Sequence, residues 1–251
     1  MRLNKYLASS GIASRRKSDE LIKLATTEIN GKICLDPAYN VKPGDKVLYD
    51  GEKIKPVDEK IVLMLNKPKN VITTVKDNHG RKTVMDLVKS KIRLTPVGRL
   101  DKDTTGILLL TNDGELQQYL THPSNRISKI YEVVIDGRVD KKSIEKVKRG
   151  IYIGYDEYGK AEIKSQKSEK GRSKIILNLK QGKKREIRRI FYRLKKKLIS
   201  LKRIGYSNLS LGNLKEGEYR YLSKDEIFEL HENWILYWQY CQQKLISPAY
   251  W

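Results

Sequence analysis

Apolar and polar positions divide the chain into many short elements of both kinds. Runs of apolar and β-branched residues predict strands, and apolar spacings of three and four predict helices. Strands are expected at 61–65, 71–75, 94–97, 106–111, 129–135, 174–179 and 198–204, and helices at 83–88, 114–120, 141–148 and 183–195. This mixture predicts an α+β fold around a mixed sheet.

The first sixty residues form a separate pattern. A short helix is expected at 2–10, and Ser14 can N-cap a second helix running to about residue 27. Asn30-Gly31 offers a hairpin turn between two short strands. A polar, proline-containing linker near 53–60 follows, so the pattern places a domain boundary near residue 60. At the other end, we expect the tail 231–251 to be a helix.

Charge changes the picture of what these domains bind. The 251 residues carry 52 Lys and Arg against 30 Asp and Glu, a formal net charge of +22. The segment 164–203 alone holds 17 of these cations and two acids, and 1–32 is a second basic segment. A run this dense repels itself unless a polyanion covers it, which favours nucleic acid as the partner and a membrane surface as the weaker alternative.

Several classes of protein are disfavoured by the same sequence. No apolar run approaches the ~20 residues that a membrane-spanning helix needs, so no membrane partner is expected and the expected location is the cytoplasm. Cys34 and Cys241 show no paired spacing that would indicate a disulfide framework or zinc site. The three histidines, His79, His122 and His231, lack ligand spacing, so no metal site is expected.

One carboxylate lies among cations where a loop meets an apolar strand. Asp101 follows Arg99 and precedes Lys102, just before the strand expected at 106–111. Loops at strand ends often carry catalytic groups. The same residue types also make an ordinary turn in which side chains bond nearby amides, and spacing alone leaves both interpretations open.

The predicted helix 183–195 carries an apolar stripe that includes Ile187. By helical rotation Arg188 borders this stripe and could reach a buried anion, whereas Arg185 and Arg189 fall on the open side and suit phosphates. A plain basic surface helix is the alternative.

Two further patterns bear on ligand binding. Lys129 and Tyr131 alternate onto one face of their strand, where the ring is either core or a stacking platform for an unstacked base. The segment 154–161 has the spacing of a phosphate-binding loop, but Ala161 lacks the hydroxyl that would hold magnesium and Asp156 and Glu157 would repel phosphates. We therefore expect no phosphate-binding loop and no cofactor.

The chain contains, in order, the motifs Leu65-Asn66-Lys67-Pro68, Val97-Gly98-Arg99-Leu100-Asp101, Asp103-Thr104-Thr105-Gly106, Lys129-Ile130-Tyr131 and Arg185-Glu186-Ile187-Arg188-Arg189. These motifs resemble those of the RsuA family of pseudouridine synthases, in particular the branch that acts on large-subunit ribosomal RNA. The first sixty residues are similar to the S4-like RNA-binding domain, named after a small-subunit ribosomal protein, through Leu3-Asn4-Lys5-Tyr6-Leu7 and Ser14-Arg15-Arg16. The tail 231–251 matches no recognised family motif.

The resemblance implies an S4-like domain at 1–60 and, at 61–230, a catalytic domain on a mainly antiparallel sheet with flanking helices. The implied activity detaches a uracil from its ribose, rotates it and rejoins it through carbon 5, without a cofactor. Asp101 would be the catalytic carboxylate, Arg188 the cation paired with it and Tyr131 the ring stacked on the base. The other expected substrate-binding residues are Arg99, Lys129, Ile187, Lys184, Arg185, Arg189, Arg15, Arg16 and Lys23.

The expected partner is ribosomal RNA or a partly assembled ribosomal subunit, and the family implies a monomer. A non-catalytic ribosome-assembly factor would use the same charge, but it has no need for a carboxylate amid cations. A base-excising hydrolase would want two carboxylates flanking the glycosidic bond, and Asp103 is the one nearby candidate for the second.

Overall fold

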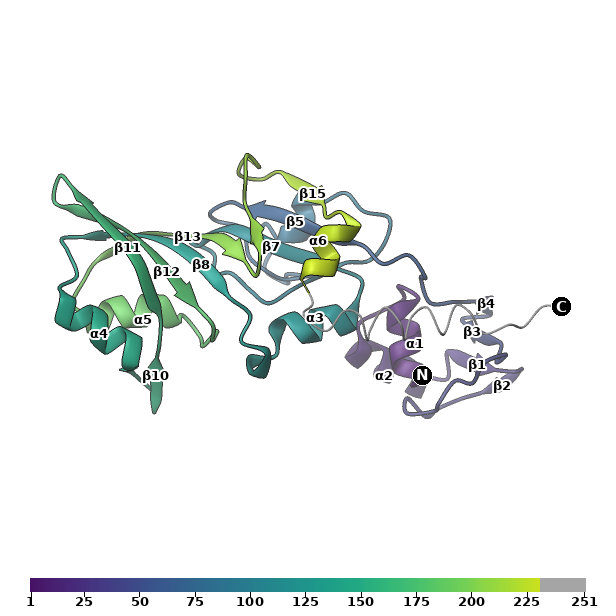
Figure 1. Cartoon of the computed structure of the whole chain (residues 1–251). Helices are drawn as coiled ribbons and strands as arrows, with labels where there is room; N and C mark the ends of the chain where they lie inside the picture. Colours follow the sequence, from purple (N-terminus) through teal and green to yellow (C-terminus); the bar gives the residue numbers. More distant parts are fainter. Residues whose placement is uncertain (231–251) are drawn as a thin grey trace. The chain divides into compact units, whose positions relative to one another are not determined.

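The computed structural model describes residues 1–230, which form two compact units (Figure 1). Unit one comprises residues 1–60 together with 90–94. Unit two comprises residues 61–89 and the described residues from 95 onward. The predicted boundary near residue 60 coincides with the end of the first segment of unit one, and the return of 90–94 to that unit had no signal in the sequence pattern.

Unit one packs two helices with a small antiparallel sheet. The helices are α1 (Leu3–Ser9) and α2 (Arg15–Lys23), and the sheet has the order β2-β1-β3-β4. Its strands are β1 (Thr27–Ile29), β2 (Lys32–Ile33), β3 (Val47–Tyr49) and β4 (Glu52–Lys53). The Ser14 side chain caps α2 by accepting a hydrogen bond from the Lys17 amide. The helix ends before residue 27, because Ala25 has a positive φ of 60° and Thr27 begins β1.

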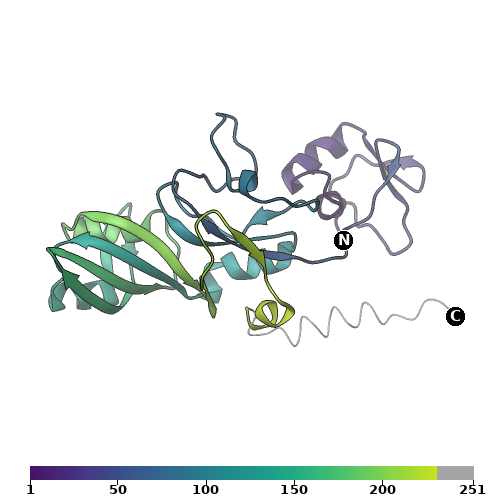
Figure 2. The same cartoon turned by 90° about the horizontal axis from the view of Figure 1, so that it is seen from above.

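Unit two is built on a mixed sheet in which the strands follow the order β11-β12-β8-β13-β7-β5-β15. All neighbours along this order are antiparallel except β13 and β7, which are parallel. The strands are β5 (Val62–Lys67), β7 (Thr105–Thr111), β8 (Lys129–Asp136), β11 (Glu162–Glu169), β12 (Arg172–Leu179), β13 (Leu198–Tyr206) and β15 (Tyr219–Tyr221). The predicted fold class is therefore confirmed. Seen from above, the green strands form a strongly twisted layer (Figure 2).

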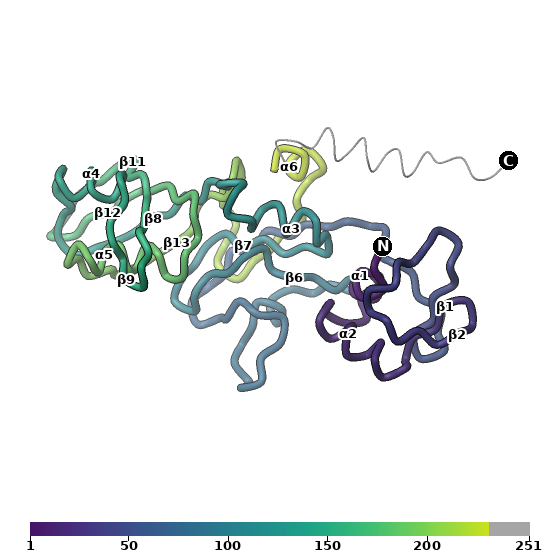
Figure 3. Tube along the Cα trace, turned by 90° about the horizontal axis from the view of Figure 1, so that it is seen from below, coloured from purple at the N-terminus to yellow at the C-terminus, as the bar shows by residue number. Residues whose placement is uncertain are grey.

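Helices α3 (Gly114–Thr121), α4 (Lys141–Arg149) and α5 (Glu186–Arg193) lie below the sheet in the view of Figure 1, and Figure 3 shows this face from below. Side chains of Asp113 and Asp140 accept amide hydrogen bonds at the starts of α3 and α4. A short final helix, α6 (Lys224–Glu229), begins with a capping box at Ser223.

Five further short elements belong to unit two. Strands β9 (Ile151–Gly154) and β10 (Glu157–Gly159) form a separate hairpin, which occupies the segment with phosphate-loop spacing. Strands β6 (Thr95–Pro96) and β14 (Leu209–Ser210) extend the main sheet beside β7 and β13. The 3-10 turn η2 (Pro123–Asn125) follows α3.

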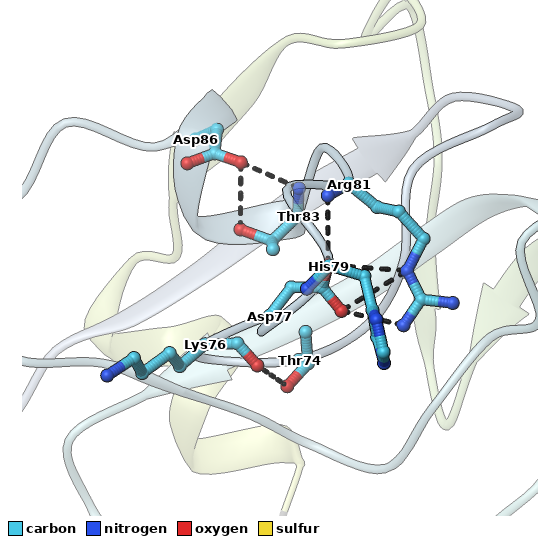
Figure 4. Close-up of polar contacts among 7 residues, drawn as sticks. All are labelled: Thr74, Lys76, Asp77, His79, Arg81, Thr83 and Asp86. Carbon is cyan, nitrogen blue, oxygen red and sulfur yellow. Dashed lines mark hydrogen bonds and ion pairs between the residues drawn. The ribbon is translucent and has the colours of Figure 1, made fainter.

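The predicted strand 71–75 and helix 83–88 are wrong in detail. The first is a loop with one bridge between Ile72 and Thr83, and the second is a 3-10 turn, η1 (Val84–Leu87). Figure 4 shows how this loop is held: the Asp77 carboxylate pairs with Arg81 at 2.7 Å. It also accepts hydrogen bonds from the backbone amides of His79 and Arg81 at 3.0 and 2.9 Å. Polar side chains therefore order this loop, in place of the sheet pairing that its β-branched residues predicted.

The parallel pair β7 and β13 forms the centre of the sheet. Every residue of β7 is buried. Gly106 has a φ of +101°, and a Cβ atom at this position would lie 2.1 Å from the Arg203 carbonyl oxygen. Only glycine allows the two strands to approach this closely.

The predicted helical tail 231–251 lies outside the described residues. Among residues 1–230, none of the helices has the length and apolar character required to traverse a bilayer.

Candidate active site

A cavity of about 540 Å³ opens in unit two. Its walls come from the loop 97–104, the segment 121–126 and the segment 179–188, and its floor from strands β8 and β13. Cavities of this size accommodate small molecules, including a nucleoside.

Asp101 lies in the loop between β6 and β7 and lines the cavity. The loop closes on itself, because the Thr104 amide donates to the Asp101 carbonyl oxygen at 3.0 Å. The Thr73 hydroxyl donates to the Leu100 carbonyl oxygen at 2.8 Å, and the Asn70 amide donates to the Lys102 carbonyl oxygen at 3.0 Å. The segment after β5 therefore fixes the backbone on both sides of Asp101.

Lys67, at the end of β5, adds a third support to this loop. Its fully buried ammonium donates to the carbonyl oxygens of Pro68 and Lys102, at 2.8 and 3.3 Å. Burial lowers the pKa of Lys67 to about 8, and the charges of Asp103 and Asp101 act in the opposite direction. The motif that begins at Leu65 thus positions the Asp101 loop.

Two arginines face the Asp101 carboxylate. Arg188 Nε lies 3.7 Å and Arg185 Nη1 lies 3.5 Å from Asp101 Oδ2. Arg188 also donates through Nη2 to the Asp103 carbonyl oxygen at 3.3 Å and to the Thr104 hydroxyl at 3.4 Å. The two distances to Asp101 lie at the long end of the range for ion pairs. Contacts between active-site groups are often this long in enzymes without substrate.

The Asp101 side chain is 38% exposed, whereas Arg188 is 20% exposed. Arg188 therefore reaches an anion, as its place beside the apolar stripe allows, but that carboxylate is partly exposed rather than buried. Asp101 lies at the wall of the cavity, where water reaches it, and the more buried partner is the arginine.

Tyr131 lies in the floor of the cavity and is 7% exposed. On the neighbouring strand β13, Arg203 pairs with Tyr131 and Tyr206 pairs with Lys129. The Lys129 ammonium donates to the carbonyl oxygens of Ile127 and Gln181, at 3.1 and 3.4 Å. Burial, and then the nearby positive charge of Arg203, lowers the pKa of Lys129 to about 8. An aromatic floor with a half-buried cation beside it suits a planar ligand that carries hydrogen-bond acceptors.

Two residues that line the cavity were not predicted as site residues from the sequence. Arg203 is 2% exposed; its Nε donates to the Ile107 carbonyl oxygen at 2.6 Å and its guanidinium lies 5.0 Å from the centre of the Tyr206 ring. Glu186 is buried and accepts amide hydrogen bonds from Lys160 and Lys183. Burial raises the pKa of Glu186. The signal for Arg203 was a cation inside an apolar strand pattern.

The structure brings seven of the predicted residues to this cavity. They are Arg99, Asp101, Lys129, Tyr131, Arg185, Ile187 and Arg188. Lys184 is exposed and does not line it. In unit one, Arg15, Arg16 and Lys23 are exposed on α2.

The expected open placement of Arg189 is wrong. Its guanidinium donates to the carbonyl oxygens of Ile153, Gly154 and Lys184 and pairs with Glu157. Only 17% of the side chain is exposed, because the β9–β10 hairpin covers this side of α5. Arg185 also departs from the predicted helix, since α5 begins at Glu186 and Arg185 adopts a left-handed conformation with φ 51°.

Two regions of the chain match known protein families. A family model described as RNA pseudouridylate synthase matches residues 61–192, and a model of the S4 domain matches residues 1–47. The chain belongs to the RNA pseudouridylate synthase family. The resemblance to the RsuA family drawn from the motifs is confirmed.

Named relatives of this pseudouridylate synthase cover nearly its whole length. The ribosomal large subunit pseudouridine synthase B of Bacillus subtilis is 38% identical over 91% of this chain and 95% of its own. The dual-specificity RNA pseudouridine synthase RluF of Escherichia coli is 34% identical over 92% of this chain and 78% of its own. A crystal structure of a pseudouridylate synthase superposes with a TM-score of 0.67 at 27% identity, covering 92% of this chain and 100% of the other.

The geometry also bears on the competing hypotheses for this pseudouridylate synthase. Asp103, the second carboxylate that a base-excising hydrolase would need, is exposed and does not line the cavity. The relatives are named as synthases, so they lend no support to a non-catalytic assembly factor. Within residues 1–230, no three His, Cys, Asp or Glu side chains gather in a way that could hold a metal ion.

Proposed function

We propose that this chain converts a specific uridine of ribosomal RNA, in the large subunit, into pseudouridine. The observation that carries the proposal is the Asp101 carboxylate, with two guanidinium groups within 4 Å of one oxygen, at the wall of a nucleoside-sized cavity. The names of the relatives, which specify ribosomal large subunit or RNA substrates, support the choice of RNA.

In this proposal Asp101 is the catalytic carboxylate. The reaction breaks the bond between N1 of uracil and C1′ of ribose and forms a bond between C5 and C1′. The proton that leaves C5 is balanced by the one gained at N1, so the net change is an isomerisation. The carboxylate can attack the sugar, attack the ring or assist a glycal route, and each requires it beside the ribose and base.

The remaining residues take positioning and binding roles. Arg188 balances the charge of Asp101 and holds its loop through the Asp103 carbonyl oxygen. Tyr131 supplies the face on which the base stacks, and Ile187 closes the wall. Arg99 and Arg185 meet the phosphates on either side of the target nucleotide, since both line the cavity from exposed positions.

A uridine inside folded RNA must leave its stack to enter this cavity, at a cost of a few kcal/mol. Stacking on Tyr131 and contacts between cations and phosphates offset that cost. The basic segment 164–203 supplies such cations within the catalytic unit, and α2 supplies Arg15, Arg16 and Lys23 in the S4 domain.

The decisive experiment maps pseudouridines in ribosomal RNA from cells that lack this protein. We expect one site, or a small set of sites, to disappear and to return with the wild-type gene but not with Asp101→Asn. Asp103→Asn is the matched control, because it removes a carboxylate two residues away that does not line the cavity. A deletion strain with unchanged modification would contradict the proposal and favour the assembly-factor alternative.

We also propose that the enzyme acts as a monomer in the cytoplasm, on naked RNA or on a partly assembled subunit. Purified protein should elute and scatter light as a single chain, and activity on transcripts should be compared with activity on assembly intermediates. A stable dimer in solution would contradict the proposed monomeric state.

A further inference from the structure

The β9–β10 hairpin presents three exposed tyrosines. Tyr152, Tyr155 and Tyr158 are 42%, 89% and 60% exposed. Large aromatic side chains are rarely left this open in a group unless they contact a partner. We call these three residues, with Arg189 and Arg193 of α5, the hairpin patch.

Each ring of the hairpin patch has one or two close neighbours. The Arg193 guanidinium lies 5.2 Å from the centre of the Tyr152 ring, and that of Arg189 lies 5.2 Å from the Tyr155 ring. Tyr152 and Tyr158 pack edge to face with ring centres 5.6 Å apart. Rings oriented by such contacts lose less conformational entropy than free rings when a planar ligand stacks on them.

The backbone at the turn of the hairpin is strained, and the turn carries an exposed tyrosine ring. Tyr155 and Asp156 both have positive φ, 54° and 53°, as the central residues of a type I′ turn do. Asn, Asp and Gly favour this conformation, whereas a bulky residue in it is an outlier. A tyrosine at this position costs stability and leaves its ring in solvent, and such strain commonly marks a functional site.

The charge around the hairpin patch fits RNA. Lys183 donates from its ammonium to the Tyr158 carbonyl oxygen at 2.9 Å and also lines the cavity, so one cation links the backbone of the hairpin to the cavity wall. Arg189 is neutralised by Glu157, and Asp156 adds one negative charge at the turn. Arg193, Lys160 and Lys183 outnumber that charge.

We propose that the hairpin patch binds unpaired bases of the substrate RNA next to the target uridine, by stacking them on Tyr155 and Tyr158. This inference rests on the proposed function, because it assigns the patch to the same RNA. Stacking on exposed rings tolerates any base, since every base has a π face. The patch therefore selects single-stranded flanks rather than a sequence.

The test measures the affinity of full-length protein for a single-stranded RNA 12-mer carrying 2-aminopurine and for a duplex of the same length. We expect Tyr155→Asn to weaken single-strand binding about fivefold or more, and Tyr155→Asn with Tyr158→Ser about twentyfold. Duplex binding should change less than about twofold, because paired bases hide their faces. Asn suits the left-handed turn, so the thermal midpoint of Tyr155→Asn should not fall.

Tyr221→Ser is the matched control, since Tyr221 is 53% exposed on β15, the edge strand of the main sheet opposite β11. It should bind both RNAs as the wild type does. Unchanged single-strand affinity in the double variant, as expected if the patch binds a protein instead, would overturn the proposal. An equal loss for the duplex would overturn it too, because it would indicate an electrostatic effect.

The two proposals fail separately. If wild-type protein forms no pseudouridine in any ribosomal RNA, the proposed function fails whatever the hairpin variants do. If pseudouridine forms normally and the hairpin variants keep the wild-type KM and single-strand affinity, only the role of the patch fails. A raised KM with unchanged kcat on a structured substrate supports the patch.

Discussion

The cations of the candidate active site and the cations of helix α2 are held in different ways. In the cavity, Lys129 donates to two carbonyl oxygens and Arg188 spans Asp101, Asp103 and Thr104. On α2, Arg15 and Arg16 are exposed. A cation fixed by several acceptors has a defined position relative to the reacting atoms, whereas an exposed cation contributes charge with little geometry.

This difference separates two kinds of contribution to one reaction. The fixed cations should affect turnover, because only groups placed against the changing bonds stabilise the transition state selectively. The exposed cations should affect affinity and its dependence on salt, because counterion release needs charge but no particular geometry. Variants of the two regions should therefore change different kinetic parameters.

The largest effect is expected at Arg188. We expect Arg188→Met to lower turnover at least 100-fold while RNA affinity stays within about threefold, because Asp101 loses the cation that balances it and that holds its loop. Single-turnover kinetics at saturating RNA measure the first quantity and anisotropy titration the second. Arg188→Lys keeps the charge without the fork and should recover part of the rate. Retained turnover in Arg188→Met would show that the pairing has no catalytic role.

The second effect tests the exposed cations of α2. Substituting Arg15, Arg16 and Lys23 together by Ala should weaken binding about tenfold or more near 0.15 M salt. It should also reduce the slope of log Kd against log salt by about 2, at roughly 0.7 to 0.9 per phosphate contact. Turnover at saturating RNA should be kept.

Lys17→Ala is the control for the α2 variant. Lys17 lies on the same helix but pairs with Glu20 at 2.8 Å, so its removal should change the salt slope less. If the triple variant lost turnover and kept its affinity, the division between fixed and exposed cations would be wrong.

How far the sequence predicted this arrangement depends on whether the signal was local. The apolar run that became β7 and the Asn30-Gly31 turn were predictable, because burial and turn conformation are written in adjacent residues. Strand β11 was missed because it is an edge strand of largely polar residues, including Lys and Gln, which protect an open edge but lack strand periodicity. Pairing with β12 makes it a strand, across a two-residue turn at Lys170 and Gly171, both with positive φ.

The same distinction applies to the site. Motif resemblance supplied Asp101, Arg188 and Tyr131, and the cavity contains all three. The helical wheel failed for Arg189, because a wheel represents the helix alone and the β9–β10 hairpin covers that side. Arg203 was overlooked because its role depends on a parallel neighbour, β7, nearly a hundred residues earlier.

The third effect concerns the pH dependence of a fixed cation. The pKa of Lys129 is about 8 in the folded chain and ordinarily 10.5, so between these values the unfolded chain holds a proton that the folded chain has lost. The free energy of unfolding should therefore rise with pH across this window, relative to Lys129→Met, by on the order of 1 kcal/mol. Urea denaturation of both proteins at pH 8 and pH 10 measures it. A parallel response of the two proteins would show that Lys129 is not desolvated.

The smallest effect is expected at an ion pair in which an exposed cation meets a carboxylate that is fixed by several hydrogen bonds. Arg81 is 54% exposed, yet its partner Asp77 is 6% exposed and also accepts two amide hydrogen bonds within the loop (Figure 4). The hydrogen bonds from Arg81 hold the pKa of Asp77 well below its usual range. The contribution of this carboxylate to loop order is thus present above its ordinary pKa and is lost as pH falls through the lowered value.

Asp77→Asn should loosen the loop without unfolding the unit. We expect the amides of His79 and Arg81 to exchange hydrogen a few-fold to tenfold faster near neutral pH, because Asn keeps an acceptor but loses the charge that strengthens both contacts. The thermal midpoint should shift by less than about 2 °C, since the Arg81 partner of the ion pair is largely exposed to solvent. Exchange measured by NMR should leave amides of β7 unchanged. If the exchange rates of His79 and Arg81 matched the wild type, the backbone alone would order this loop, and pairing an exposed cation would not suffice to fix it.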